Sequence, residues 1–284
     1  MIKSKIKKVA VIGAGTMGQG IVHLTSLAGY PTLWYDVKDE ILENGISNLT
    51  ANLQKGLEIG KISKEEKQNA LQNIEVTTNK NDLVADLIIE AVVEDLQIKS
   101  KLFEAIEKIN DSTAIFATNT SSIPITSIAS KLKHPERFIG LHFFNPAHIM
   151  KLVEIISGAN TDHSVVVQIQ EFANILGKTP VLANDSPGFI VNRVARHYYT
   201  ESLKILEENV ADIQTIDALL ESTGFKMGPF RLMDLIGVDV NFAVTESMYN
   251  SFHQDPKFRP NRIQEHKVLA GHHGKKSKKG FYDY

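Results

Sequence analysis

Two residues twelve positions apart are of the types needed to move a proton. His142 lies near the end of the apolar segment RFIGLHFF (137–144), and Glu154 lies inside the apolar segment KLVEIIS (151–157). Histidine suits acid–base catalysis because its ordinary pKa is about 6.5, and a carboxylate among apolar neighbours needs a polar partner. If the two segments form neighbouring strands, Glu154 can accept a hydrogen bond from one ring nitrogen of His142, which leaves the other nitrogen to act as a base. A structural hydrogen bond in the core is the alternative interpretation.

Most other histidines give no pattern that points to chemistry. Five lie in helical or loop contexts that look like surface, and two are adjacent in a tail rich in glycine and lysine. None has the spacing of metal ligands, and the chain contains no cysteine, so we expect no metal site, disulfide or thiolate chemistry. These histidines are His23, His134, His163, His253, His266, His272 and His273.

A glycine-rich loop near the start of the chain predicts a dinucleotide site. The segment VAVIGAGTMGQGI (9–21) reads as a buried strand, a G-x-G-x-x-G loop and the start of a helix, and Asp36 ends the next strand. The N–H groups of such a loop bind a pyrophosphate with help from the helix dipole, and the acid accepts the ribose hydroxyls. Asp36 would repel a 2′-phosphate, which favours NAD over NADP. A purely structural turn and a solvated Asp36 are the alternatives. The expected loop contacts are Gly13, Gly15, Thr16, Met17 and Gly18.

The elements that must position these residues alternate along the first two-thirds of the chain. Strand patterns occur at 8–14, 31–36, 73–78, 86–92, 113–119, 137–144, 151–157 and 178–184. Helical patterns occur at 19–29, 97–110, 125–132 and 162–176, with a polar helical pair near 39–72. This alternation predicts an α/β fold with a Rossmann-type, doubly wound and mostly parallel sheet.

The pattern changes at Ser186-Pro187-Gly188. Beyond it only helical patterns occur, at 189–208, 212–222 and about 235–252, with MGP and DPKFRP as breaks. We therefore expect an NAD-binding domain at 1–185, which includes the helical pair, and an all-helical C-terminal domain at 186–284.

Composition limits the classes of protein. The chain has 284 residues, a hydrophobic content of 43% and a net charge of −2, so we expect neither nucleic acid nor a membrane as partner. No segment approaches the roughly 20 apolar residues of a membrane span. The basic start and the short apolar run after it resemble a signal peptide only superficially, because glycines break the run. We expect a cytoplasmic protein.

Six further motifs, in this order, make the sequence similar to a known family. They are ATNTSS (117–122), GLHFFNP (140–146), MKLVEII (150–156), DSPGFIVNR (185–193), MGPF (227–230) and KKGFYDY (278–284). Over essentially the whole chain the sequence resembles the short-chain L-3-hydroxyacyl-CoA dehydrogenases, which include bacterial 3-hydroxybutyryl-CoA dehydrogenases. The segment 227–245 is especially similar to members of phenylacetate breakdown that oxidise 3-hydroxyadipyl-CoA.

The resemblance implies roles for individual residues. His142 matches the family's catalytic base and Glu154 its acidic partner, and Ser121 and Asn192 match residues that contact the substrate oxygen. Alternatively, Ser121 caps a helix and Asn192 is an ordinary residue at a helix start. For Lys99 the alternative to a cofactor contact is an ordinary surface charge. For Lys276 the alternative is a place in a solvated tail. The implied further cofactor contacts are Glu94, Lys99, Asn119, Asn145 and Lys276.

The sequence also departs from the family's pattern. Relatives usually carry proline where this chain has His148, which either alters the pocket or faces water. The helical pair at 39–72 should hold the coenzyme A end, but Leu49 stands where relatives have a serine, and Lys55 only lies near their lysine.

The expected reaction is NAD-dependent oxidation of a 3-hydroxyacyl-CoA, with 3-hydroxybutyryl-CoA favoured and 3-hydroxyadipyl-CoA as the alternative. The rivals are a dehydrogenase of free 3-hydroxy acids and a non-catalytic NAD-binding structural protein. The resemblance also implies a homodimer through the helical domain, which should form one wall of the substrate cleft. Three basic residues of that domain are candidates to meet a distal carboxylate, namely Arg196, His197 and Arg231.

Overall fold

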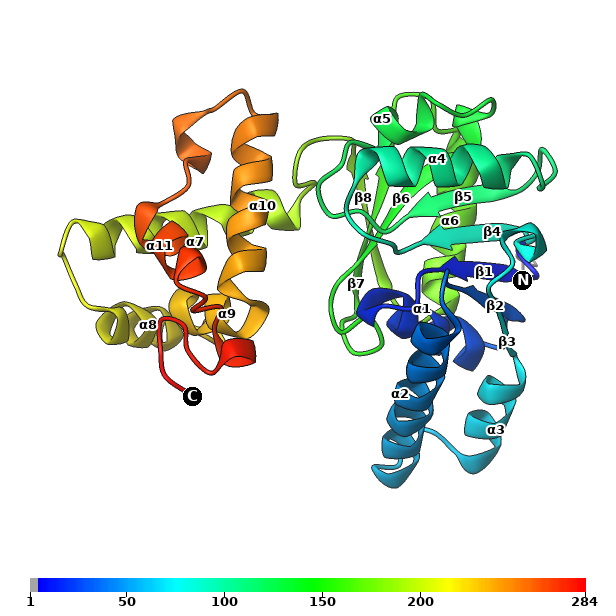
Figure 1. Cartoon of the computed structure of the whole chain (residues 1–284), viewed down its shortest axis with the longest axis horizontal. Helices are drawn as coiled ribbons and strands as arrows, with labels where there is room; N and C mark the ends of the chain where they lie inside the picture. Colours follow the sequence, from blue (N-terminus) through cyan, green and yellow to red (C-terminus); the bar gives the residue numbers. More distant parts are fainter. Residues whose placement is uncertain (1–4) are drawn as a thin grey trace. The chain divides into compact units, whose positions relative to one another are not determined.

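The computed structural model describes residues 5–284 and consists of two compact units (Figure 1). The first unit ends at Ser186, and the second runs from Pro187 to Tyr284. Residues 1–4, the start of the basic segment compared above with a signal peptide, lie outside the described residues. Within residues 5–284, no helix has both the length and the apolar character needed to cross a membrane.

The first unit is built on one eight-stranded sheet. Neighbouring strands run parallel, except that β7 runs antiparallel to β6. Each strand lies within its predicted segment, and the prediction of a doubly wound, mostly parallel sheet is confirmed. The strands are β1 (Val9–Ile12), β2 (Thr32–Tyr35), β3 (Ile74–Thr77), β4 (Leu87–Glu90), β5 (Ile115–Thr118), β6 (Phe138–Phe143), β7 (Leu152–Ser157) and β8 (Thr179–Asn184). Their order across the sheet is β3-β2-β1-β4-β5-β6-β7-β8.

The central strands are buried at every residue. This holds for β1, β2, β4 and β5, whose near-continuous apolar runs are typical of parallel strands covered by helices on both faces. The strand order reverses at β1, which pairs with β2 on one side and with β4 on the other. In such sheets ligands bind at the carboxyl ends of the strands next to this reversal.

Six helices belong to the first unit. They are α1 (Thr16–Leu27), α2 (Asp39–Glu58), α3 (Lys64–Gln72), α4 (Leu96–Glu107), α5 (Ile125–Ala129) and α6 (His163–Ile175). The helix α1 begins three residues before its predicted start, because Gly15 is its N-cap. The predicted helical pair is α2 and α3, which extend from the sheet side by side (Figure 1). Ser63 and Glu66 start α3 with a capping box, in which each side chain accepts the other residue's backbone N–H.

The second unit is entirely helical. Its helices are α7 (Val191–Glu207), α8 (Ile213–Ser222), α9 (Pro229–Ile236), α10 (Val238–Ser251) and α11 (Arg262–Leu269). Residues such as Leu203, Phe230 and Met233 form its core and are completely buried. The predicted helix over about 235–252 is α10, which begins three residues later because Gly237 has a φ of +107° and separates it from α9. The helix α9 was not predicted. The helix α11 after the DPKFRP break was not predicted. Short 3₁₀ turns lie at Lys80–Asp82, Pro135–Arg137, Pro256–Phe258 and Lys275–Ser277.

Candidate active site

The glycine loop between β1 and α1 is packed so tightly that two of its glycines have no room for a side chain. Gly13 has a φ of +104°, and a Cβ there would lie 2.6 Å from the carbonyl oxygen of Ala91. A Cβ on Gly18 would overlap the carbonyl oxygen of Gly13. At Gly15, by contrast, no atom of residues 5–284 beyond its chain neighbours lies within 4 Å of the Cβ position. Internal packing therefore explains Gly13 and Gly18, whereas Gly15 borders open space.

The start of α1 can hold an anion at this open space. Gly15 is the N-cap of this 12-residue helix, and no side chain caps its first N–H groups. Asp36 lies against the same loop, because its Oδ2 accepts a hydrogen bond from the N–H of Ala14 at 2.8 Å and its Oδ1 one from Val37 at 2.7 Å. Asp36 is therefore anchored at the loop rather than merely solvated. Loop, helix start and carboxylate together have the chemistry of a dinucleotide site.

A buried ion-paired network lies at the ends of β4 and β5. Lys99 is 1% exposed, and its Nζ lies 2.6 Å from Oε1 of Glu90 and 3.3 Å from Oε2 of Glu94. Glu90 is completely buried and also accepts hydrogen bonds of 2.7 Å from the N–H of Val92 and the hydroxyl of Thr118. The alternative of Lys99 as a surface charge is wrong. Its contact with a cofactor stays a prediction.

Glu94 holds the segment that carries Ser121. Its Oε1 accepts hydrogen bonds from the backbone N–H groups of Ser121 and Ser122 at 3.0 and 3.2 Å, and from the hydroxyl of Thr120 at 2.5 Å. Burial alone would raise the pKa of Glu94, but Lys99 and the hydrogen bonds from Thr120 and Ser121 outweigh it and hold that pKa below its ordinary value. Glu94 therefore stays charged and keeps this segment in place.

Ser121 does not cap the helix that follows it. The N-cap of α5 is Pro124, and the first N–H groups, from Ile125 and Thr126, donate to the carboxylate of Asp185 at 3.0 and 2.8 Å. The capping alternative for Ser121 is therefore wrong, while its contact with substrate stays a prediction.

The expected contact between His142 and Glu154 is present. The antiparallel register of β6 and β7 places the two residues opposite each other, and Nδ1 of His142 lies 2.8 Å from Oε2 of Glu154. His142 is 6% exposed and Glu154 is completely buried. Because Glu154 occupies Nδ1, any proton exchanged with a ligand has to use Nε2.

Two asparagines complete this edge of the sheet. Asn119 follows β5, and its Oδ1 accepts a hydrogen bond of 2.8 Å from the N–H of Phe143 in β6. Asn145 follows β6, is exposed and precedes a cis peptide bond to Pro146. Apart from Lys55, the structure thus gathers the candidates of the first unit at the carboxyl ends of β1, β2, β4, β5 and β6.

The remaining candidates belong to the second unit or to α2, and their roles stay predictions. Asn192 is in the first turn of α7 in the second unit, where Ile190 and not Asn192 is the N-cap. Lys276 pairs with Asp239 at 2.7 Å. Lys55 is exposed in the last turn of α2, whereas Leu49 is completely buried in the same helix and so has no surface to offer a ligand.

The prediction that His23 lies on the surface is wrong. His23 is 8% exposed on α1, and its ring centroid lies 4.9 Å from that of His148. Burial, together with His148 and Lys178, lowers the pKa of His23 to about 4. Burial also lowers the pKa of Lys178 to about 8. His148 therefore packs on a buried neighbour instead of simply facing water, and this cluster holds bases without a carboxylate.

Glu90 is a site residue that sequence reasoning missed. The segment DLIIEAV (86–92) places its carboxylate at the end of an apolar strand. The same signal, an acid in an apolar run, singled out Glu154 and would have found Glu90.

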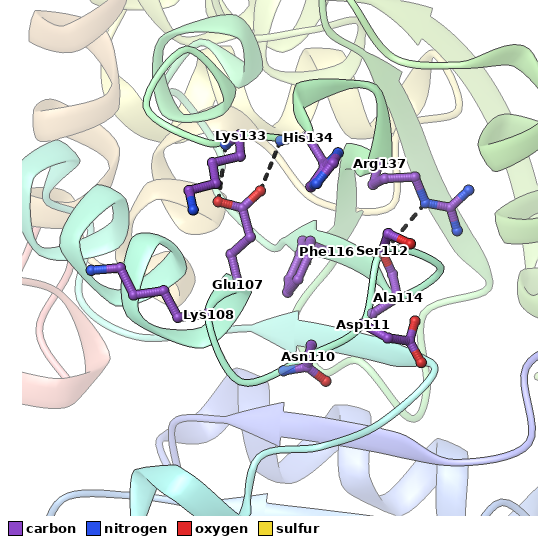
Figure 2. A pocket seen from close by; sticks show the side chains of 10 residues that line it. All are labelled: Glu107, Lys108, Asn110, Asp111, Ser112, Ala114, Phe116, Lys133, His134 and Arg137. Atoms are coloured by element: carbon purple, nitrogen blue, oxygen red, sulfur yellow. Dashed lines mark hydrogen bonds between the residues drawn. The ribbon is translucent and has the colours of Figure 1, made fainter.

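A pocket of about 190 Å³ lies at the opposite edge of the sheet (Figure 2). Glu107 points toward Lys133 and His134, whose backbone N–H groups donate to its carboxylate at 2.9 and 2.8 Å. The pocket sits at the amino ends of β5 and β6, so it contains none of the predicted site residues. Its lining consists of Glu107, Lys108, Asn110, Asp111, Ser112, Ala114, Phe116, Lys133, His134 and Arg137.

Two family models match the chain. The model described as "3-hydroxyacyl-CoA dehydrogenase, NAD binding domain" matches residues 8–186. The model described as "3-hydroxyacyl-CoA dehydrogenase, C-terminal domain" matches residues 188–284. The two matches meet where the two structural units meet.

Proteins of known name are similar over nearly all of this chain. The 3-hydroxyadipyl-CoA dehydrogenase of Escherichia coli (strain K12) is 46% identical over 281 residues, which are 98% of this chain but 59% of that protein. A 3-hydroxybutyryl-CoA dehydrogenase of Mycobacterium tuberculosis is 36% identical over 283 residues, 98% of this chain and 99% of that protein. A solved structure called 3-hydroxybutyryl-CoA dehydrogenase from E. coli K12 has a TM-score of 0.96 at 46% identity, and covers 98% of this chain and 60% of that one.

Proposed function

We propose a reaction for this chain from one premise, which is that the chain belongs to the 3-hydroxyacyl-CoA dehydrogenase family. Its first unit is the NAD-binding domain of that family. The proposed reaction is the oxidation of a (S)-3-hydroxyacyl-CoA to a 3-ketoacyl-CoA, and the reverse. NAD, when bound, supplies the acceptor of the hydride that leaves C3 of the substrate.

In this proposal His142 takes the proton of the 3-hydroxyl on Nε2. Glu154, which lies 2.8 Å from Nδ1, fixes the tautomer in which Nε2 carries no proton, and stabilises the imidazolium that forms. Ser121 and Asn192 hold the substrate oxygen as it becomes a carbonyl. The two electrons of the oxidation would leave C3 as the hydride that the bound cofactor accepts, and the accompanying proton would leave the hydroxyl on His142.

The observation that carries this proposal is the His142–Glu154 pair at the same edge of the sheet as the glycine loop. A buried histidine–carboxylate pair can also serve only to stabilise the core. The position of this pair at the same sheet edge as the dinucleotide loop favours a catalytic role. Glu94, Lys99, Asn119, Asn145 and Lys276 enter the proposal as cofactor contacts or as residues that hold them. Lys55 enters only as a contact of the coenzyme A end.

The test is NADH oxidation followed at the nicotinamide absorbance with acetoacetyl-CoA as substrate. The proposal expects turnover of the thioester and none of free acetoacetate. Turnover of free acetoacetate alone would support the free-acid dehydrogenase. NADH binding without any turnover would support the non-catalytic NAD-binding protein.

The acyl group of the substrate needs its own measurement, because similar proteins are named for substrates with different acyl groups. The E. coli relative is named for 3-hydroxyadipyl-CoA and the mycobacterial one for 3-hydroxybutyryl-CoA. We keep both as substrates of this proposal, so the measurement includes 3-oxoadipyl-CoA beside acetoacetyl-CoA.

We also propose a cytoplasmic homodimer that forms through the second unit. Large apolar side chains there are exposed, with Leu219, Leu235 and Val240 at 61%, 51% and 47%. Such residues on one unit favour an interface. Light scattering of the purified chain would give twice the monomer mass if this is right, and a monomer would contradict it.

A further inference from the structure

The second unit contains a buried arginine whose charge meets no carboxylate. Arg196 lies on α7 and is 3% exposed. Its hydrogen bonds go to the carbonyl oxygen and Oδ1 of Asn241, at 2.8 and 3.4 Å, and to the hydroxyl of Thr245 at 2.7 Å. All three acceptors are neutral, and none of the ion pairs found among residues 5–284 involves Arg196. Burial of an arginine in this way is costly unless something supplies negative charge.

These hydrogen bonds hold the guanidinium through a single nitrogen. Nη1 is the donor in all three, while Nε has no hydrogen-bond partner among residues 5–284. The ring of Tyr199 lies 4.8 Å below the guanidinium and fixes its plane. The edge formed by Nε and Nη2 is one of the two edges with which arginine binds a carboxylate through parallel hydrogen bonds.

A second donor in the same network is also unsatisfied. Nδ2 of Asn241 is buried and has no partner among the described residues. Its amide orientation is fixed, because Oδ1 accepts hydrogen bonds from Nε2 of Gln264 at 2.9 Å and from Arg196. Two neighbouring side chains thus each carry a buried donor that lacks an acceptor. Buried donors usually have an acceptor, so two such donors side by side favour a ligand group that accepts hydrogen bonds.

We propose that Arg196 binds the carboxylate at the far end of a dicarboxylic acyl chain, with Asn241 and Thr245 holding the guanidinium in position. This inference rests on the proposed function. Arg196 follows Asn192 by four residues, so both lie on one face of α7, about 6 Å apart along the axis. Asn192 is the residue proposed to hold the substrate oxygen. A chain with a few methylenes between C3 and a terminal carboxylate has the length to connect the two positions.

The two other basic candidates of this unit are already engaged. Nη1 of Arg231 donates to both carboxylate oxygens of Glu221, at 2.9 and 3.1 Å. The ring of His197 stacks on Phe258 at a centroid distance of 5.5 Å. Arg196 keeps its charge for a ligand at neutral pH, since burial lowers its pKa only to about 10, against an opposing effect of Tyr199.

The first experiment changes the substrate rather than the protein. Initial rates of the wild-type chain are measured with 3-oxoadipyl-CoA and with the same thioester whose far carboxylate is replaced by a carboxamide. Loss of a buried charge-assisted pair predicts kcat/KM about 10- to 100-fold lower for the amide. Equal values would overturn the proposal, and so would a preference for the amide.

The second experiment assigns the effect to Arg196. Arg196→Gln should remove the preference for the acid over the amide, while kcat/KM for acetoacetyl-CoA changes little. Arg231→Gln is the matched control with the same change of charge in the same unit, and it should keep the preference. A folded Arg196→Gln that keeps the preference would overturn the proposal, and so would its loss in Arg231→Gln. If Arg196→Gln fails to fold, the rates of the wild-type chain with 3-oxoadipyl-CoA and with its carboxamide analogue still decide whether the protein recognises the far carboxylate.

Other acceptors predict different outcomes of the same experiments. If a buried water satisfies the two donors, acid and amide give equal rates. If a carboxylate of a second copy of this chain does so, Arg196→Gln lowers the mass seen by light scattering without changing the preference. Either result overturns the proposal. Turnover of acetoacetyl-CoA without carboxylate preference leaves the proposed function intact, whereas absence of turnover with every thioester contradicts the proposed function itself.

Discussion

The two units of this protein each bury a long cationic side chain, and they treat its charge in opposite ways. Lys99 in the first unit lies within 3.3 Å of two carboxylates, from Glu90 and Glu94. Arg196 in the second unit has only neutral acceptors. A cation enclosed by carboxylates is satisfied by the chain itself and holds other residues in place. Arg196 is enclosed by neutral groups and, in our proposal, the carboxylate of the ligand supplies the negative charge that the chain does not.

The largest effect on stability should come from breaking the balanced network. Lys99→Met leaves two carboxylates side by side, with Glu90 completely buried, and should lower the free energy of unfolding by about 3–5 kcal/mol. Urea unfolding followed by circular dichroism measures this. Lys101→Met, on the exposed side of the same helix, is the matched control. A loss below about 1 kcal/mol would mean that this network does not hold the first unit together.

The buried carboxylate of Glu154 also has a partner inside the chain, but here that partner, His142, serves the reaction. His142→Ala should lower turnover by about 10²- to 10⁴-fold with NADH affinity nearly intact. Glu154→Gln should lower turnover less and shift the acidic limb of the rate profile. His163→Ala, on an exposed position of α6, is the control. Unchanged turnover of His142→Ala would remove this residue from the mechanism.

The cluster of His23 and His148 shows a third way to bury a basic side chain, in which the side chain stays neutral because its pKa is lowered. The pKa of His23 falls from 6.5 to about 4 through burial, His148 and Lys178. Burial, with smaller effects of Lys178 and Lys61, likewise lowers the pKa of His148. Between pH 6.5 and 4 the unfolded chain therefore binds more protons than the folded one at His23, so stability falls as the pH drops through this range. Over this range the wild-type chain should lose about 3 kcal/mol of stability through His23.

This dependence is measured by unfolding at a series of pH values. His23→Leu should lose less stability than the wild-type chain between pH 6.5 and pH 4. His134→Leu, at an exposed position, should behave like the wild-type chain. Equal acid sensitivity of His23→Leu and the wild-type chain would contradict the buried neutral state of this ring.

The smallest effect on stability should follow removal of Arg196. Arg196→Met deletes a buried charge that has no counter-charge, and this gain offsets the hydrogen bonds lost to Asn241 and Thr245. The free energy of unfolding should therefore change by no more than about 1 kcal/mol. A loss as large as that of Lys99→Met would show that the two networks do not differ in the way proposed here.

The sequence predicted the first unit better than the second, for physical reasons. Parallel strands such as β1 and β4 are buried on both faces, so their apolar runs stand out, and all eight strands lie in their predicted segments. In the second unit the helix α9 was not predicted, because Met227-Gly228-Pro229 is interpreted as a break, whereas Pro229 is the first residue of that helix.

For the candidate site, the sequence identified residue types but not their environments. The strand pattern placed His142 and Glu154 near each other, since one apolar strand follows the other along the chain. The burial of Lys99 depends on Glu90 and Glu94, which come from other segments, and spacing along the chain does not show such contacts. The stacking of His23 on His148 joins residues 125 positions apart and was missed for the same reason.

Gly13, Gly15 and Gly18 of the glycine loop are needed for different reasons, so different screens should detect their replacement. Replacement of Gly13 or Gly18 by alanine meets backbone atoms, so a screen for folded protein would reject it. Gly15→Ala meets open space at a φ of −71°, which any residue adopts, so the same screen would accept it. Only a screen that requires a bound dinucleotide would reject it. A library of variants sorted first for expression and then for turnover should therefore keep alanine at position 15 in the first step and lose it in the second.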